Sequence, residues 1–293
     1  MTRGASTLER NESLIAWYRE HARRLPWRDI DDPYVTLVSE VMLQQTQVDR
    51  VVPKFTSFIA RWPTVTSLAV ADPAEVLEAW SGLGYNTRAL RLAETARIIA
   101  SSRWPTTPDD LQHLPGIGPY SAAAIASIAF DYQTPAIDTN IRRVLNRWLG
   151  TQLDGKELTE AATAVVGHPA GDWNQAMMDL GASLCRPRDP VCNDCPVVPW
   201  CADPNIYDAP ARQSTFKGSN RELRGALVRA HVQGDDVWDA GRSLARTDEE
   251  ITTTLGILNR EGLISGSEAP GKRETDRPTS RGSSRGVPCP GSS

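Results

Sequence analysis

The chain has 293 residues, of which 40% are hydrophobic and 23% are charged, and its formal net charge is −4 at pH 7. These values are ordinary for a globular protein, and the length suits about two domains. No apolar run reaches the roughly 20 residues that a membrane-spanning helix needs, so we expect no membrane partner. The N-terminal residues lack an apolar secretion signal, which favours a cytoplasmic location. Because the net charge is acidic, any DNA contact must rest on local basic residues and backbone donors.

From the N-terminus to residue 210 the sequence predicts helices and no strands. Apolar residues recur at helical spacing, and Pro, Gly and Asp separate the segments. A first amphipathic helix includes residues 14–18 and ends before Leu25, and a second run extends over 37–48 and stops near Pro53. The predicted fold class is therefore all-α. Further helices are expected at residues 54–61, 73–79, 87–101, 108–113, 120–130, 139–149 and 173–185.

A separate region begins near residue 213. Residues 221–231 and 248–261 are predicted to form two helices of a small C-terminal module over residues 213–265, either purely helical or of the winged-helix kind. From residue 266 onward Gly, Ser, Pro and Arg dominate, so residues 266–293 are expected to form a disordered tail.

Four cysteines in the pattern C-x6-C-x2-C-x5-C begin where the last helix of the first region is predicted to end. Clustered thiolates suit a zinc ion or an iron–sulfur cluster, because both accept four sulfur ligands. Zinc ribbons usually contain two C-x2-C pairs, whereas this pattern contains one, so the spacing favours a loop around a larger cluster. A pair of disulfides is the alternative, which a reducing cytoplasm disfavours. The predicted metal ligands are Cys185, Cys192, Cys195 and Cys201, while Cys289 is distant and expected to be dispensable.

Residues 111–122 are predicted to form two helices joined by the tight hairpin L-P-G-I-G. Gly116 and Gly118 are expected to adopt positive φ angles and to let the backbone approach a ligand closely. The second helix begins directly after the hairpin, and its free N–H groups and positive dipole end suit a phosphate. This pattern is typical of the helix–hairpin–helix motif of sequence-independent DNA binding, although an ordinary corner between two helices uses the same kind of turn.

Two acidic residues lie at sequence positions that suit a catalytic role. Glu40 is a lone acid on an otherwise apolar helical stretch, and a partly buried glutamate would hold a proton near neutral pH. Asp138 lies just before the helix predicted at 139–149, where an aspartate ordinarily caps the helix N-terminus. Its place between a helix–hairpin–helix and four cysteines favours a functional role over simple capping.

The order of a G-x-G hairpin, a downstream aspartate and this cysteine pattern resembles the helix–hairpin–helix DNA glycosylases of the endonuclease III superfamily. The resemblance covers residues 17–201. It implies a two-lobed fold with a 4Fe-4S cluster, in which residues 33–137 form a six-helix barrel and residues 8–32 with 138–208 form the cluster domain. Four segments are similar to those of MutY-type adenine DNA glycosylases: residues 25–28, 39–47 (S-E-V-M-L-Q-Q-T-Q), 80–85 and 174–181.

The resemblance also implies an activity, which is hydrolytic removal of adenine mispaired with 8-oxoguanine or guanine in base excision repair. The enzyme would act as a nucleoid-associated monomer on double-stranded DNA. In the family, the residue matching Glu40 protonates the flipped adenine, and the residue matching Asp138 stabilises the positive charge that develops on the sugar. Tyr120 and Asn140 match positions of the same catalytic network. Tyr120 also stands where the bifunctional branch has a Schiff-base lysine, so we expect base removal without strong strand cleavage.

The resemblance further assigns residues that flip and hold the base. Flipping costs a few kcal/mol and needs side chains that fill the gap in the base stack. Gln45 and Tyr85 match the residues that the family inserts into the helix, and Gln44 and Thr46 flank the first of them. The residues that match the lining of the family's adenine pocket are Trp27, Arg28, Leu43 and Gln175.

The C-terminal region departs from the family, whose members carry a longer, strand-rich domain that reads 8-oxoguanine. Two alternatives to adenine removal remain open. One is a thymine or uracil mismatch glycosylase on the same scaffold, which Glu40 disfavours, and the other is a non-catalytic, cluster-bearing DNA-binding protein, which the pair of Glu40 and Asp138 disfavours. Arg50, Arg88, Arg91 and the C-terminal module are expected to help hold DNA. Local basic clusters occur at Arg142, Arg143 and Arg147 and at Arg186 with Arg188.

Overall fold

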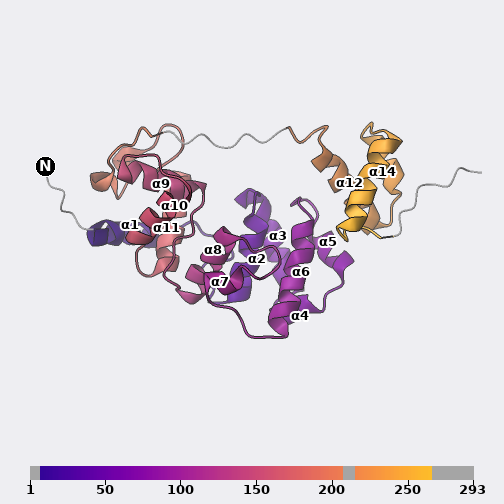
Figure 1. Ribbon diagram of the computed structural model, residues 1–293, viewed down its shortest axis with the longest axis horizontal. Helices are drawn as coiled ribbons and strands as arrows, with labels where there is room; N and C mark the ends of the chain where they lie inside the picture. Colours follow the sequence, from indigo (N-terminus) through magenta and orange to yellow (C-terminus); the bar gives the residue numbers. More distant parts are fainter. Residues whose placement is uncertain (1–6, 207–214, 266–293) are drawn as a thin grey trace, which may run out of the picture.

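The computed structural model describes residues 7–206 and 215–265, and all regular structure within these residues is helical (Figure 1). The prediction of an all-α fold is thereby confirmed. Within the described residues, no helix is both long and apolar enough to span a membrane. The tail predicted at 266–293 and Cys289 lie outside the described residues.

The helices of the central lobe pack around α2. Every residue of α2 from Tyr34 to Met42 is buried, because the helix is apolar on most sides and therefore belongs in the core. Its N-cap Asp32 fixes its start by accepting a hydrogen bond from the Tyr34 amide at 2.8 Å. α2 contacts α3, α6 and α8. The helices of this lobe are α2 (Pro33–Leu43), α3 (Val48–Arg61), α4 (Val65–Ala69), α5 (Pro73–Trp80), α6 (Thr87–Ala100), α7 (Pro108–Leu111) and α8 (Pro119–Phe130).

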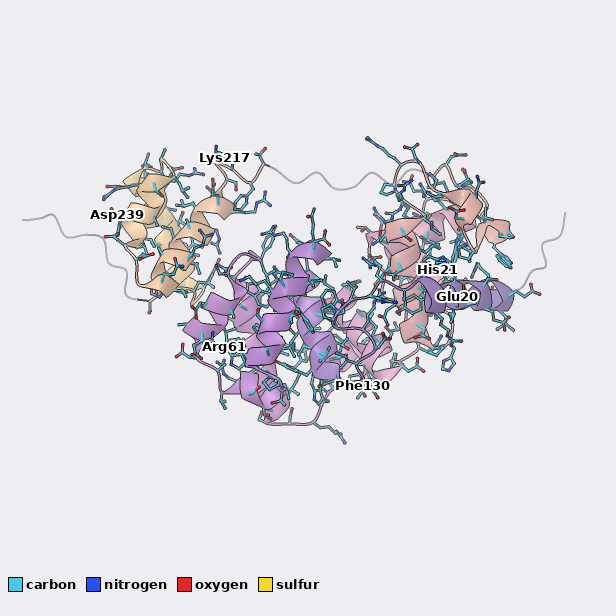
Figure 2. All side chains as sticks on the ribbon, turned by 180° about the vertical axis from the view of Figure 1, so that it is seen from behind. Glu20, His21, Arg61, Phe130, Lys217 and Asp239 are labelled. Carbon is cyan, nitrogen blue, oxygen red and sulfur yellow. The ribbon has the colours of Figure 1, made fainter. Side chains whose placement is uncertain are left out.

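The second lobe joins the N-terminal helix to the residues that follow position 138. α1 packs against α11, which packs against α9, and their shared apolar core includes Leu14, Leu145 and Trp173. α8 also contacts α11, so the two lobes meet there. Figure 2 shows Phe130, at the end of α8, on the side of the central lobe that faces the second lobe. The elements of this lobe are α1 (Thr7–His21), α9 (Thr139–Leu149), α10 (Gly155–Val165), α11 (Ala170–Ser183) and the short turns η1 (Cys192–Asp194) and η2 (Val198–Trp200).

The C-terminal module consists of α12 (Asn220–Gln233), α13 (Val237–Ser243) and α14 (Asp248–Arg260). No strand occurs in residues 215–265, so the helical alternative holds and the winged-helix alternative, which requires strands, does not. α12 packs against α5, and its Leu223 and Leu227 are fully buried in the same apolar core as the central lobe (Figure 1).

Some helix boundaries differ from the prediction. The single run expected over residues 37–48 is wrong, because α2 ends at Leu43 and α3 begins at Val48. Pro53 lies inside α3, where it removes one backbone hydrogen bond, and α3 tolerates this loss because its apolar face is buried in the core. The sequence pattern also misses α4 and α13, which are short, and α10, which buries few apolar side chains.

Candidate active site

A cavity of about 830 Å³ opens where α2, α8, α9 and α11 meet. Its lining also includes Thr36, Ser39, Ile128 and Met178, to which the sequence pattern assigned no role. The assigned residues that lie outside the cavity are Gln44, Tyr85, Gly116 and Gly118. The assigned residues that line it are Glu40, Tyr120, Asp138, Asn140, Trp27, Arg28, Leu43, Gln45, Thr46 and Gln175.

Glu40 lies in the last turn of α2 with 6% of its surface exposed. Its Oε2 atom is buried and has no hydrogen-bond partner among the described residues, while the Tyr120 hydroxyl donates to the carboxylate. Burial raises the pKa of Glu40 to about 7, with the Tyr120 bond and Arg28 opposing this shift and Asp138 adding to it. The side chain therefore holds a proton close to neutral pH, at the wall of the cavity.

Asp138 caps α9 and lines the same cavity. Its Oδ1 accepts a hydrogen bond from the Ile141 amide at 2.7 Å, and its Oδ2 accepts one from Asn140 Nδ2 at 2.8 Å. Burial raises the pKa of Asp138 above its ordinary value, and these hydrogen bonds and the charge of Arg143 reduce that rise. Capping and chemistry are compatible here, because the cap bond fixes the direction of the carboxylate and the polar partners favour its ionised form.

Asn140 is held in place by a buried arginine. Arg143 Nη2 donates to Asn140 Oδ1 and to the Gly181 carbonyl, each at 2.8 Å, and Arg143 Nε donates to the Cys185 carbonyl at 2.8 Å. A Cβ at Gly181 would lie 2.5 Å from Asn140 Cβ, so α11 can approach this closely only with glycine. Two arginines of the basic cluster, Arg143 and Arg147, are only 4% and 2% exposed, so they are buried and do not form a basic surface. Arg143 instead connects the cavity to the cysteine loop.

Arg28 lines the cavity as part of an ion-pair network. Asp179 accepts hydrogen bonds from Arg28 Nη1 at 2.5 Å, from Arg28 Nη2 at 2.8 Å and from Arg23 Nε at 2.7 Å. Burial raises the pKa of Asp179, but the bonds and charges of the two arginines hold it below its ordinary value. Both Nη atoms of Arg28 therefore bond Asp179, and the side chain forms part of the cavity wall. The sequence pattern gave Asp179 no role, although a lone acid in the otherwise apolar stretch before Cys185 was a usable signal.

Gln45 and Tyr85 occupy two loops in left-handed backbone conformations, with φ angles of 54° and 48°. Such angles are uncommon for residues other than glycine. Arg88 fastens both loops, since it donates to the Gln44 carbonyl at 2.6 Å and to the Gly84 carbonyl at 3.0 Å, and its guanidinium lies 5.6 Å from the centre of the Tyr85 ring. The expectation that Arg88 holds DNA is wrong, because it is 8% exposed. Its contacts set the geometry of the loops.

The hairpin between α7 and α8 leaves a helix N-terminus accessible. Gly116 has a φ of 79°, but Gly118 has a φ of −89°, so the predicted positive angle is right for the first glycine and wrong for the second. Gly118 is the exposed N-cap of α8, and a Cβ there would meet no atom within 4 Å. The N-terminus of α8 is therefore open to a phosphate. Gln44 lies beside it, with Nε2 donating to Ser121 Oγ at 3.0 Å.

The four cysteines lie in the segment that follows α11 and contains η1 and η2, and all four are free thiols. Burial, and then the neighbouring thiols Cys185, Cys195 and Cys192, raise the pKa of Cys201 to about 11, so the four sulfurs form one electrostatic group. Among the described residues, no three His, Cys, Asp or Glu side chains are placed to hold a single metal ion. Four free thiols in one short segment supply the four sulfur ligands that either a zinc ion or an iron–sulfur cluster accepts.

Arg147 of α9 holds the cysteine segment through hydrogen bonds. Its Nη1 donates to Cys185 Sγ at 3.1 Å and to the Arg186 carbonyl at 2.8 Å, and its Nε donates to the Ile206 carbonyl at 3.0 Å. Hydrogen bonds of this kind orient a sulfur ligand around a metal centre.

Comparison with known proteins agrees with this architecture. Residues 38–169 match the family described as HhH-GPD superfamily base excision DNA repair protein. The adenine DNA glycosylase of Mycolicibacterium smegmatis is 42% identical over 228 residues, which cover 73% of this chain and 78% of that protein. The adenine DNA glycosylase of Mycobacterium tuberculosis H37Rv is 38% identical over 232 residues, which cover 74% of this chain and 76% of that protein. A solved thermostable thymine-DNA glycosylase is 30% identical with a TM-score of 0.61, and the match covers 66% of this chain and 93% of that one.

The fold, the hairpin and the paired carboxylates are those of a helix–hairpin–helix DNA glycosylase. The chain belongs to the HhH-GPD superfamily of base excision DNA repair proteins, which confirms the family predicted from its motifs. The mycobacterial relatives are adenine DNA glycosylases, in agreement with the MutY-type segments of the sequence.

Proposed function

We propose that the protein is a monofunctional adenine DNA glycosylase that removes mispaired adenine from duplex DNA in base excision repair. The observation that carries this proposal is the pair of Glu40 and Asp138 on one cavity, the first with its pKa raised to about 7 and the second hydrogen-bonded on both oxygens. One carboxyl group is thus able to donate a proton, while the hydrogen bonds on both oxygens of the other stabilise its anion. This division of labour is the one that hydrolysis of a glycosidic bond requires.

The reaction follows from these two environments. Glu40 donates its proton to a ring nitrogen of the flipped adenine, so the electrons of the bond between sugar and base leave with a neutral base. Positive charge then develops on the deoxyribose, and the Asp138 carboxylate stabilises it. A water molecule adds its oxygen to the anomeric carbon and gives a proton to the Glu40 carboxylate, which restores the acid for the next reaction. Tyr120 and Asn140 hold the two carboxylates through the hydrogen bonds described above.

Among the described residues, no lysine lines the cavity, which supports a monofunctional reaction. Strand cleavage by the bifunctional branch begins with a lysine that attacks the sugar and forms a Schiff base. The sequence has no lysine between Lys54 and Lys156, and Tyr120 stands at the position in question. A phenol cannot form a Schiff base, so water is the nucleophile.

We assign base flipping and base holding to the residues on the rim and wall of the cavity. Gln45 and Tyr85 project from loops that Arg88 fastens, and both fill the gap that the flipped adenine leaves in the stack. The wall that receives the base is formed by Trp27, Arg28, Leu43 and Gln175, with Gln44 and Thr46 on either side of Gln45.

We propose that a 4Fe-4S cluster is held by Cys185, Cys192, Cys195 and Cys201. When bound, such a cluster would supply four metal–thiolate bonds that hold the segment from Cys185 to Cys201 together, and no step of base removal passes through it. Protein purified without oxygen should contain about four irons and four sulfides per chain. Stoichiometric zinc in a colourless, active protein would contradict the assignment. Cys289→Ser should leave the iron content unchanged.

The domain assignment is also a proposal. Two separate apolar cores support a barrel at residues 33–137 and a cluster domain at residues 8–32 with 138–208, and the C-terminal module at 213–265 packs on the barrel. We propose a monomer that acts on chromosomal DNA in the cytoplasm, where its thiols stay reduced.

The identity of the base partner is tested by a single-turnover release assay on three duplexes. We expect adenine release opposite 8-oxoguanine and opposite guanine. The similarity to a thymine-DNA glycosylase makes thymine opposite guanine the appropriate third duplex. Release of thymine without release of adenine would replace the proposed function by the mismatch-thymine alternative.

A further inference from the structure

α12 contains a glycine that no contact within the described residues explains. Gly225 lies in the interior of this helix, where glycine is less stable than alanine. A Cβ built on Gly225 meets no heavy atom within 4 Å outside its own helix. By contrast, a Cβ on Gly181 in α11 would lie 2.5 Å from Asn140, and one on Gly241 in α13 would lie 2.6 Å from Ile251. Packing therefore requires glycine at positions 181 and 241 but does not require it at position 225.

The space above Gly225 belongs to a groove of about 470 Å³ between α12 and the loop that carries Tyr85, which we call the α12 groove. Gln45 and Arg50 line both the α12 groove and the active-site cavity, so the two hollows adjoin at these residues. The residues that α12 contributes recur at intervals of three and four, as expected for one face of a helix: Arg221, Arg224, Gly225, Val228, Arg229, Val232 and Gln233.

The charges that line the α12 groove are mostly positive, although the chain as a whole is acidic. The one lining acid is Glu78, whose Oε2 lies 3.5 Å from Arg61, and Arg224 pairs with Glu261 at 2.5 Å. Arg229 is exposed. The lining arginines are Arg50, Arg221, Arg224 and Arg229. Such a lining attracts a polyanion.

We propose that the α12 groove binds the sugar–phosphate backbone of duplex DNA beside Gln45, with a phosphodiester passing over Gly225 and its charge facing Arg229. This inference rests on the proposed function, because it requires duplex DNA seated on the cavity. DNA with Gln45 in its stack reaches both hollows, since Gln45 lines both. Because Gly225 has no side chain, the DNA backbone can occupy the space that the methyl group of an alanine would fill. Backbone contacts position a duplex without reading its bases, so the groove contributes affinity and not base discrimination.

The first test substitutes Gly225 by alanine and uses Gly256→Ala in α14 as the matched control. Gly256 is also inside a helix, lines neither hollow, and its added Cβ would meet only Arg260 Nη1 at 3.7 Å. Both substitutions should raise the melting temperature, by about 2–4 °C, because alanine favours the helix. Gly225→Ala alone should weaken binding of a matched duplex, by about threefold or more, because its methyl group occupies the approach path. Equal DNA affinity of the two variants would overturn the proposal.

The second test addresses charge with Arg229→Gln, and Arg260→Gln, an exposed arginine at the end of α14, is its control. The slope of log affinity against log salt concentration should fall by about 1 for Arg229→Gln and stay unchanged for Arg260→Gln. Matched and mispaired duplexes should lose the same factor. The ratio of adenine release opposite 8-oxoguanine to that opposite guanine should remain within about twofold of wild type. An unchanged slope would contradict a phosphate contact, and a collapsed ratio would contradict a backbone role.

These outcomes separate the inference from the proposed function. If wild-type protein bound duplex DNA but released no adenine, the proposed function would fail, and the affinities of the variants would still decide the role of the groove. If wild-type protein released adenine while both variants bound DNA as tightly as it does, the inference alone would fail. All measurements use the full chain with its cluster.

Discussion

The active-site cavity and the α12 groove share Gln45 and Arg50 but are built in different ways. In the cavity, Glu40 is 6% exposed, Asp138 is fixed by two hydrogen bonds, and Arg28 is committed to Asp179. In the groove, arginines such as Arg229 stand exposed around a helix surface without a side chain at Gly225. Proton transfer requires a pKa that burial sets, whereas holding a polyanion requires charge and access.

Glu40→Gln tests the cavity with the largest expected effect. The amide keeps the shape of the side chain and can accept the Tyr120 hydrogen bond, but it cannot donate the required proton. Single-turnover adenine release should fall about a thousandfold or more, with duplex affinity largely unchanged. Near-wild-type release would remove the acid role of Glu40 and favour the pyrimidine alternative.

Asp138→Asn separates charge from helix capping. Asparagine is as good an N-cap as aspartate, so α9 should remain capped while the anion is lost. We expect adenine release to fall about a hundredfold with little change in melting temperature. The matched control is Asp72→Asn at the N-cap of α5, away from the cavity, which should leave release unchanged. Equal effects of the two substitutions would assign Asp138 a capping role alone.

The pH profile measures the environment of Glu40 directly. The rate of base release should be highest where Glu40 is protonated and should fall about tenfold per unit as the pH rises above about 7. The raised pKa also affects stability, because the folded state holds this proton more tightly than the unfolded state. That contribution is fully present below about pH 4.5 and is lost as the pH rises through about 7. Glu40→Gln should therefore reduce the decline of melting temperature over this range, and an identical decline would contradict the raised pKa.

Arg88→Met tests whether base removal depends on the geometry of the two loops that carry Gln45 and Tyr85. Arg88 bonds carbonyl groups of both loops, so its loss should let Gln45 and Tyr85 leave their left-handed conformations. Release of adenine from a duplex should slow about tenfold, whereas release from a single strand, which needs no wedge, should change little. An equal loss on both substrates would indicate general destabilisation. Arg88→Lys should recover part of the duplex rate, because an ammonium group can bond some of the same carbonyls.

Removal of residues 213–293 should have the smallest effect on chemistry. The cavity residues and both carboxylates precede Cys185, so adenine release should stay within about threefold of wild type while duplex affinity weakens moderately. The melting temperature should fall, because Leu223 and Leu227 no longer cover α5. The assay compares the full chain with a chain that ends at Arg212. If the preference for adenine opposite 8-oxoguanine collapsed while the rate opposite guanine held, the module would read the lesion.

The motifs of this chain are local, and local patterns were sufficient to identify them. The all-helical fold and the superfamily followed from helical periodicity, a G-x-G hairpin, an aspartate and four cysteines. The sequence also singled out the side chains that the fold gathers on one cavity, including Glu40 on α2 and Asp138 on α9. The break between α2 and α3 was missed because Pro53 looked like a helix end although burial of the apolar face of α3 outweighs one lost hydrogen bond.

The roles of the arginines were decided by tertiary structure alone. The sequence suggested a DNA contact for Arg88 and a basic cluster that includes Arg143 and Arg147, yet each of the three is buried and bonded to backbone carbonyls of distant segments. Arg229 and Gly225 carried no signal at all, because exposure and empty space are properties of the packed helices. A sequence states which groups carry charge, but the surroundings of a charge in the fold decide whether it supports a loop, sets a pKa or meets a phosphate.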